Sequence, residues 1–168
     1  MTTTSISVAR KSDAGALAAL RWSVACGMTG QFGHGHWSAC PSRAEVLRQV
    51  RASHVLVARR EGEIIGTVRL VPALPALFDS SAFTPVERPW YVLGLAVSPT
   101  VRGAGVGRQL MEAAKEAAQA RGAQALWLDA YDHIAGAGPF YQKCGFRRVG
   151  RTESHEVPLF YFEWLVSG

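Results

Sequence analysis

The stretch YVLGLAVSPTVRGAGVGR, residues 91–108, decides the fold class of this 168-residue chain. Its first seven residues form a nearly continuous apolar run, which is typical of a strand covered on both faces. The run ends before Pro99, three alternating glycines follow, and from Val106 to Ala117 apolar residues recur at helical spacing. A second buried strand is expected at 125–128. Such a strand–loop–helix–strand unit implies parallel neighbouring strands joined by a right-handed crossover.

The loop between that strand and that helix has the features of an anion-binding site. Gly103, Gly105 and Gly107 carry no side chains that would shield the backbone N–H groups. The helix that follows points its positive N-terminal end at the same place. Arg102 and Arg108 add two positive charges beside the loop. These residues predict a phosphate-binding loop.

Two other glycine-rich phosphate loops fit this stretch poorly. A Walker loop requires Gly-Lys followed by Ser or Thr, whereas the chain has Gly107-Arg108-Gln109. A dinucleotide fingerprint requires Gly or Ala where Arg108 stands, although Asp129 at the end of the next strand would suit a ribose. Only about forty residues follow Asp129, which is too few for a doubly wound sheet. The Walker loop is therefore excluded and the dinucleotide fingerprint is disfavoured.

The remaining elements complete a mixed α/β sheet in a single domain that spans residues 1–168. Ser12 and Asp13 offer an N-cap for a helix over 14–24, and Ser42 caps a second helix over 43–52. Gly62 can take the positive φ of a hairpin turn. The expected strands lie at 6–9, 54–58, 64–71, 146–149 and 157–165, the expected loops at 27–41 and 72–89, with a short helix near Phe78 and another over 138–144.

Composition and charge limit the classes of function. Apolar residues make up 48% of the chain and charged residues 18%, which argues against a disordered chain or a coiled coil. The net charge of +5 is dispersed, with 10 basic against 6 acidic residues over 1–88 and 8 against 7 over 89–168. No basic run appears, so we expect no nucleic-acid partner. The mild positive excess suits a small anionic ligand.

The cysteines and the N-terminus indicate a cytoplasmic protein. Cys26, Cys40 and Cys144 are odd in number and form no Cys-x-x-Cys, which argues against a disulfide framework. The first residues lack the basic and apolar regions of a signal peptide. The longest apolar uncharged stretch, 89–101, is shorter than the ~20 residues of a membrane helix, so no membrane partner is expected.

Two motifs about 35 residues apart resemble those of the GNAT superfamily of N-acetyltransferases. Arg102-x-x-Gly105-x-Gly107, placed after an apolar strand, looks like the acetyl-CoA loop of that family. Downstream, AGPFYQKCGF at 137–146 resembles its closing helix, with the Phe-Tyr and Gly-Phe pairs. The resemblance is dense over 91–149 and implies a cofactor-binding core there. It implies a mostly antiparallel mixed sheet, flanked by helices, whose parallel central pair splays apart.

The resemblance also implies how acetyl-CoA is bound. The pantetheine arm would lie between the splayed strands and bond to the backbone, while the loop would hold the pyrophosphate. Gly94 fits the bulge that starts the splay. The implied cofactor-binding residues are Leu95, Ala96, Val97, Arg102, Gly103, Ala104, Gly105, Val106, Gly107 and Arg108.

By the same resemblance, Tyr141 matches the tyrosine that protonates the departing thiolate of coenzyme A. The amine would attack the thioester directly, so no covalent enzyme intermediate is needed. The chain departs from the family pattern at Ile134, where Asn is frequent, and at Leu93 and Gly94, where an acidic base is frequent. A base would then be Asp129, Asp132 or His133 at the end of the next strand, or a chain of waters. The simpler interpretation of Tyr141 is a core residue, since Phe140 beside it packs.

The resemblance implies that the loop at 27–41 forms part of the acceptor pocket, because the matching linker of this family overhangs that pocket. His34-Gly35-His36, near Cys26 and Cys40, has no recognised zinc-ligand spacing, so no metal is expected. The candidate substrate-binding residues are Phe32, His34, His36, Trp37, Trp90, Asp129 and Tyr131.

Taken together, the sequence predicts an acetyl-CoA-dependent N-acetyltransferase acting on a primary amine of a small molecule. A protein or peptide N-acetyltransferase and a non-catalytic acyl-CoA-binding module are the alternatives. A homodimer is one option for assembly, because the strand at 157–165 can pair with a partner subunit.

Overall fold

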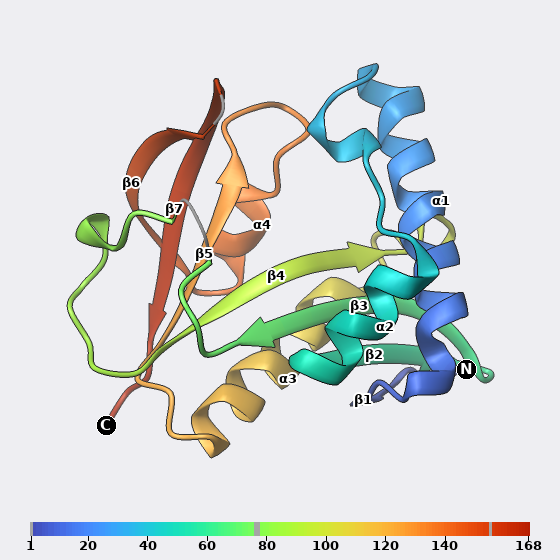
Figure 1. Cartoon of the computed structure of the whole chain (residues 1–168), viewed down its shortest axis with the longest axis horizontal. Coiled ribbons are helices and arrows are strands. Elements are labelled where there is room, and N and C mark those ends of the chain that lie inside the picture. Colours follow the sequence, from blue (N-terminus) through green and yellow to red (C-terminus); the bar gives the residue numbers. More distant parts are fainter. Residues whose placement is uncertain (1, 76–77, 155) are drawn as a thin grey trace. The chain divides into compact units, whose positions relative to one another are not determined.

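The strands of the chain form one mixed sheet in the order β1-β2-β3-β4-β5-β7-β6 (Figure 1). The computed structural model describes residues 2–75, 78–154 and 156–168. The strands are β1 (Ser5–Val8), β2 (His54–Arg60), β3 (Glu63–Val71), β4 (Pro89–Val97), β5 (Ala125–Tyr131), β6 (Arg147–Ser154) and β7 (Val157–Leu165). The helices are α1 (Ala14–Phe32), α2 (Arg43–Ala52), α3 (Val106–Ala120) and α4 (Gly138–Lys143). None of the described helices is both long and apolar enough to span a membrane.

The pairing of β4 with β5 confirms the parallel central pair expected from the crossover unit. These two strands run parallel, from Pro89↔Ala125 to Tyr91↔Trp127. The pairs β1–β2, β5–β7 and β6–β7 are antiparallel. The predicted α/β class with a mostly antiparallel sheet and flanking helices is therefore confirmed.

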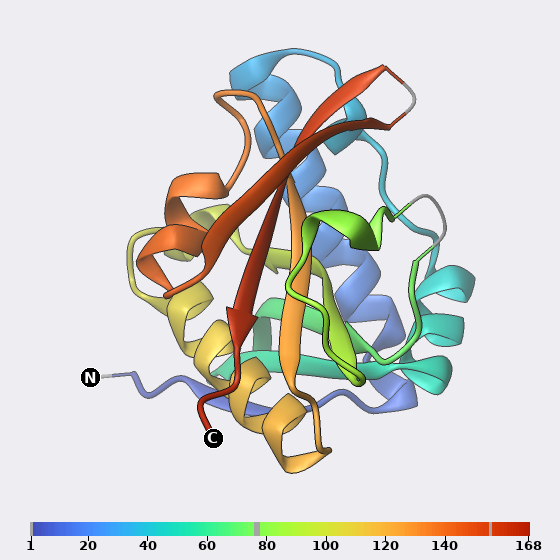
Figure 2. The same ribbon diagram turned by 90° about the vertical axis from the view of Figure 1, so that its left-hand side faces the viewer.

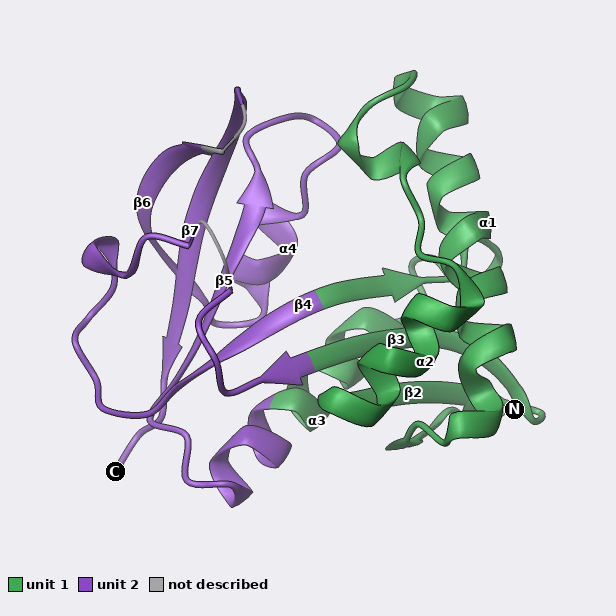
Figure 3. Cartoon of the chain, in the orientation of Figure 1, with its two compact units in different colours: residues 1–69, 94–114 green, residues 70–93, 115–168 purple. Residues whose placement is uncertain are grey.

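The chain divides into two compact units (Figure 3). Unit 1 contains residues 1–69 and 94–114, and unit 2 contains residues 70–93 and 115–168. Strands β3 and β4 and helix α3 each contribute residues to both units. The glycine-rich loop thus belongs to unit 1, and Tyr141 belongs to unit 2.

In unit 1, helices α1 and α2 cover one face of the strands, and the first turns of α3 lie on the other (Figures 1 and 2). Leu17 of α1 and Val46 of α2 are buried in one cluster with Val57 of β2. Helix α2 begins where the sequence predicts, because Ser42 accepts the Glu45 N–H at 3.2 Å and Glu45 in turn accepts the Ser42 N–H at 2.6 Å. Such a capping box stabilises a helix start.

Helix α3 approaches β3 closely at Gly66. A Cβ at Gly66 would lie 2.9 Å from Leu110 Cδ1 and 3.1 Å from Val106 Cγ1. Val106 and Leu110 are themselves fully buried. The glycine therefore lets the first turn of α3 rest directly on the sheet, which fixes the position of that helix end.

The expectation of a loop over 27–41 is wrong for residues 27–32, because helix α1 continues to Phe32. The two glycines in this stretch, Gly27 and Gly30, cost about 1 kcal/mol each relative to alanine. Packing outweighs that propensity: Ala25 is buried, and a Cβ at Gly27 would touch the Pro99 ring at 3.4 Å. The helix ends at Gly33, whose φ of 80° is a left-handed conformation suited to glycine.

In unit 2, strand β7 lies between β5 and β6. Seven residue pairs join it to β5, from Ala125↔Leu165 to Tyr131↔Leu159. Its other edge pairs with β6, from Arg147↔Glu163 to Ser154↔Val157. Both edges are occupied within the chain, so the expectation that the strand at 157–165 pairs with a partner subunit is wrong.

Helix α4 and the segment before β4 lie on opposite sides of the strands of this unit (Figure 2), and the unit contains an aromatic cluster. The ring of Phe83 stacks on Trp127 with centroids 4.4 Å apart and also contacts Tyr161. Phe78 contacts Tyr91 and Tyr161. The short helix expected near Phe78 is a 3-10 turn at Ser80–Ala82, and residues 76–77 of the predicted loop lie outside the described residues.

Glu163 of β7 is the most deeply buried charged residue of this unit, with 1% of its surface exposed. Its carboxylate accepts the Thr84 N–H at 2.9 Å and the Thr84 hydroxyl at 2.7 Å, and pairs with Arg147. Burial alone would raise the pKa of Glu163, but Arg147 and Thr84 outweigh it and hold the pKa below its usual value. The carboxylate therefore ties the segment before β4 to β7.

Replacing Glu163 by Gln is expected to lower the free energy of unfolding by about 2 kcal/mol at pH 7, because an amide cannot satisfy three donors. A glutamate in the unfolded chain titrates near 4.3, and the native pKa is lower. The stabilisation is thus complete above that value and is lost as the pH falls through the native pKa. Urea denaturation at pH 7 and pH 3 measures both effects. The exposed Glu116→Gln is the control, and an equal midpoint for the two variants at pH 7 would contradict the prediction.

Candidate active site

The glycine-rich loop in unit 1 connects β4 to α3 through a 3-10 turn at Pro99–Val101. Gly103 and Gly105 have φ values of 80° and 78°, in the left-handed region that favours glycine. No other atom lies within 4 Å of a Cβ built on either residue. Backbone conformation, not crowding, is therefore what requires glycine here.

Helix α3 presents unsatisfied donors at the same loop. Its first helical bond recorded at this end joins Gln109 N–H to Gly105 C=O at 3.1 Å. The N–H groups of the first turn have no partner inside a helix and are available to an anion. Arg102 and Arg108 are both exposed, and neither forms an ion pair with any described residue. The loop has the donors and the charge to hold a pyrophosphate.

Strand β4 has a bulge-like irregularity at Gly94, which has a φ of 62°. A Cβ there would lie 2.5 Å from Arg21 Nη2, so the guanidinium of Arg21 rests directly on the glycine. The recorded pairing of β4 with β5 ends at Tyr91, before this point. Beyond Gly94, Leu95 and Val97 are half-buried and Ala96 is buried.

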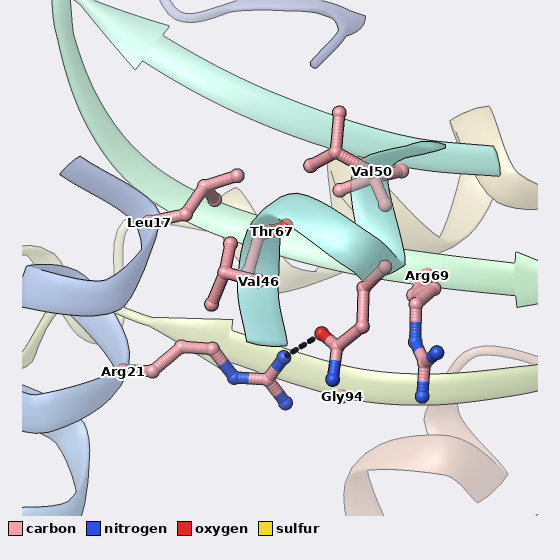
Figure 4. Close-up of a pocket in the computed structure, with 9 residues that line it drawn as sticks. Leu17, Arg21, Val46, Val50, Thr67, Arg69 and Gly94 are labelled. Carbon is pink, nitrogen blue, oxygen red and sulfur yellow. Dashed lines mark hydrogen bonds between the residues drawn. The ribbon is translucent and has the colours of Figure 1, made fainter. Parts of the chain in front are cut away.

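A narrow pocket in unit 1 opens beside Gly94 (Figure 4). Its volume is small, about 10 Å³, and it is partly open to solvent. Arg21 from α1, Gln49 from α2 and Arg69 from β3 supply its polar groups. Its apolar walls come from Leu17, Val46, Val50 and Val55.

Tyr141 in unit 2 lies on helix α4, with 8% of its surface exposed. Its ring contacts Phe140, Phe146 and Phe162, with centroids 5.4, 6.0 and 6.1 Å away. Lys115 Nζ donates to Cys144 C=O at 2.5 Å and so satisfies a carbonyl just past the end of this short helix. The position of Tyr141 is thus set by both packing and a helix cap.

Burial raises the pKa of Tyr141, and the negative charge of Asp129 raises it further. The phenol is therefore fully protonated at neutral pH, as a proton donor must be. Asp129 of β5 is exposed, yet the surrounding protein desolvates its carboxylate and raises its pKa. The pKa of Tyr131 is raised by burial and by Asp129 as well. Asp129, Tyr131 and Tyr141 therefore form one electrostatically coupled group.

The predicted acceptor residues fall into two groups, one in each unit. In unit 1, Phe32 contacts Trp37 at 6.3 Å between ring centroids, and Trp37 Nε1 donates to Gly33 C=O at 2.9 Å. His34 and His36 lie in the same turn of chain. In unit 2, Trp90 is on β4, and Asp129 and Tyr131 are alternate residues of β5.

The comparisons with known proteins now bear on this arrangement. A family model described as the acetyltransferase (GNAT) family matches residues 19–146. The chain belongs to the GNAT family. It is accordingly an acetyltransferase, and acetyl-CoA is its acetyl donor. The chain has no match among curated proteins.

Solved structures with this fold resemble the GNAT chain over nearly its whole length. A GCN5-related N-acetyltransferase of Rhodopseudomonas palustris has a TM-score of 0.74 at 22% identity, with 99% of this chain and 98% of that chain covered. A GNAT acetyltransferase of Streptococcus pneumoniae has 0.72 at 21%, covering 98% and 100%. The yncA protein of Salmonella typhimurium, solved with its cofactor acetyl-CoA, has 0.74 at 16%, covering 99% and 95%. Identities this low show a shared fold.

Sequence reasoning missed Arg21, Gln49 and Arg69 in this GNAT chain. Arg21 is the one charged residue inside the otherwise uncharged sequence of α1, which was a signal that this helix face meets something polar. Arg69 is one basic residue in a mostly apolar strand, and that pattern alone does not indicate a binding role. Only the packing of α1 and α2 over β3 brings the two arginines to one pocket.

The sequence also drew attention to candidate metal ligands, to three cysteines and to Ile134. Within the described part of the GNAT chain, no three His, Cys, Asp or Glu residues gather as metal ligands would. All three cysteines are free thiols: Cys26 and Cys40 are exposed and Cys144 is buried. Ile134, where the family frequently has Asn, is 83% exposed.

Proposed function

We propose that this acetyltransferase transfers the acetyl group of acetyl-CoA to a primary amine of a small molecule, by direct attack in a ternary complex. The amine nitrogen attacks the thioester carbonyl, the C–S bond breaks, and the products are an N-acetylated amine and coenzyme A. The observation that carries the proposal is the start of α3, where backbone N–H groups lie beside the exposed Arg102 and Arg108, in a chain of the GNAT family.

The proposed cofactor site uses the backbone of β4 and of the following loop. Leu95, Ala96 and Val97 bond to the pantetheine arm, and Gly94 begins the departure of β4 from its parallel neighbour. Residues 102–108 hold the pyrophosphate. On this proposal the whole chain serves as one catalytic domain, with its cofactor-binding core at about 91–149.

The proposed general acid is Tyr141, and the proposed base is Asp129. Of the three base candidates, Asp132 is paired with Arg151 at 2.8 Å, and His133 Nδ1 accepts the Ala135 N–H at 2.9 Å. Asp129 is exposed and its raised pKa makes it a stronger base than an ordinary aspartate. Asp129 takes the proton that the amine nitrogen loses, while Tyr141 gives its proton to the thiolate. Solvent then restores both residues.

A small acceptor is favoured over a peptide by the narrow pocket beside Gly94. Its lining comes from five elements of unit 1 and leaves little room for a bulky group. A peptide acceptor would require an open groove instead. Within unit 1, the candidate residues Phe32, His34, His36 and Trp37 would supply further contacts to the acceptor.

The test is release of free thiol from acetyl-CoA in the presence of small amines and of peptides with free N-termini or lysines. We expect turnover with small amines and little with peptides. Peptides as the better acceptors would overturn the small-molecule assignment. Binding of coenzyme A, measured separately by calorimetry, tests the loop whichever acceptor is used.

A further inference from the structure

Two positively charged side chains meet in the pocket of unit 1, and none of the described residues that line it is acidic. Arg21 and Arg69 extend over strand β4 near Gly94 (Figure 4). Arg21 Nη1 donates to Gln49 Oε1 at 3.3 Å, which is a neutral acceptor. Arg69 Nε is buried and has no hydrogen-bond partner among the described residues. Neither guanidinium forms an ion pair within the described part of the chain.

Two other half-buried arginines of unit 1 have oxygen partners: Arg59 pairs with the Asp13 carboxylate at 2.6 Å, and Arg60 Nη2 donates to the Thr4 hydroxyl at 3.1 Å. Desolvating a guanidinium without a counter-charge is unfavourable. Two like charges share this pocket, which adds to the cost. Burial and the charge of Arg69 lower the pKa of Arg21, and Cys40 offsets this only in part. Burial lowers the pKa of Arg69 as well. An anion is the complement that the pocket lacks.

Gly94 ties this charged pocket to the proposed transfer site. Its missing side chain is what admits the Arg21 guanidinium, and its positive φ sets the course of β4 into Leu95 and Val97. On the proposed function, those next residues hold the coenzyme arm. An anionic group bound by the two arginines would therefore belong to the acceptor, not to the pyrophosphate, which has its own loop.

We propose that the acceptor is an amine that carries a carboxylate, of the amino-acid class, and that Arg21 and Arg69 bind this carboxylate. The inference rests on the proposed function. A carboxylate is flat and offers two oxygens to the planar fork of an arginine. That shape suits a narrow pocket with aliphatic walls better than a tetrahedral phosphate or phosphonate does. The role of the arginines is recognition, and they take no part in proton transfer.

The experiment compares matched acceptors that differ only in the anionic group. Each α-, β- or γ-amino acid is tested beside its carboxamide and its aminophosphonate, with acetyl-CoA saturating. We expect kcat/KM for the best acid to exceed that for its amide by about 100-fold, because the charged hydrogen bonds to both arginines are lost in the amide. Arg21→Met and Arg69→Met should each remove most of this preference, because kcat/KM for the acid should fall much further than kcat/KM for the amide.

The matched control is Arg51→Met, an exposed arginine on α2 outside the pocket, which should keep the full preference. Binding of coenzyme A by calorimetry verifies that each variant is folded. Equal kcat/KM for acid and amide, or failure of every amino acid to react, would overturn the inference. A better rate with the aminophosphonate would overturn the carboxylate assignment. Neutral amines distinguish the two proposals. If they are acetylated and no amino acid is, the carboxylate inference fails while the proposed acetyl transfer to a small amine still holds.

Discussion

Replacing Tyr141 by Phe is expected to lower kcat by about 100-fold or more, with the Kd for coenzyme A unchanged. The phenylalanine ring keeps the contacts with Phe140, Phe146 and Phe162, so helix α4 should stay in place. Only the hydroxyl is lost, and with it the proton for the departing thiolate. Steady-state kinetics at saturating acetyl-CoA, together with calorimetry of coenzyme A binding, measure the two quantities separately.

The pH dependence of the turnover rate also tests the role of Tyr141. A general acid works only while protonated, and the pKa of Tyr141 is raised by burial and by Asp129. The wild-type rate should therefore show no loss from this group as the pH rises to about 10, the ordinary pKa of tyrosine. Tyr91→Phe is the matched control, because Tyr91 is also buried but belongs to the aromatic cluster. If Tyr141→Phe and Tyr91→Phe turned over equally fast, Tyr141 would have no part in the proton transfer.

Replacing Arg102 by Glu is expected to raise the Kd for coenzyme A by about 30-fold at low salt, since it exchanges an attractive charge for a repulsive one beside a pyrophosphate. Arg102 is exposed, so the effect should shrink as added salt screens it. The left-handed glycines and the buried face of α3 are untouched, and the free energy of unfolding should stay the same.

Calorimetric titration with coenzyme A at two ionic strengths measures this effect. Arg51→Glu, a charge reversal on an exposed face of α2, serves as the control for net charge. An unchanged Kd in Arg102→Glu would mean that the loop does not bind the phosphates. A loss that is independent of salt would point to misfolding of the loop instead.

Local signals in the sequence were sufficient where local chemistry controls the structure. Ser42 begins α2 through its own capping box, and Gly103 and Gly105 supply the left-handed turns that the loop requires. The apolar run at 91–97 became β4, extended by two residues at its start. In each case the residue that determines the structure acts on its immediate neighbours.

Prediction was incomplete where distant segments control the structure. Helix α1 continues through Gly27 and Gly30 because packing offsets their low helix propensity, and no local pattern reports that packing. Arg21 and Arg69 reach the same pocket only because α1, α2 and β3, which are far apart in the chain, pack together. The position of β7 between β5 and β6 depends on pairing that periodicity does not encode.

The position of β7 between β5 and β6 affects how unit 2 folds during synthesis. Strand β6 leaves the ribosome before β7, yet its antiparallel partner in this unit is β7. Until β7 emerges, both β5 and β6 expose an unpaired edge, and the buried Glu163 that anchors Thr84 is missing. Nascent chains stalled before residue 157 should therefore recruit chaperones and digest readily in unit 2. Release of β7 lets a single strand close two edges at once.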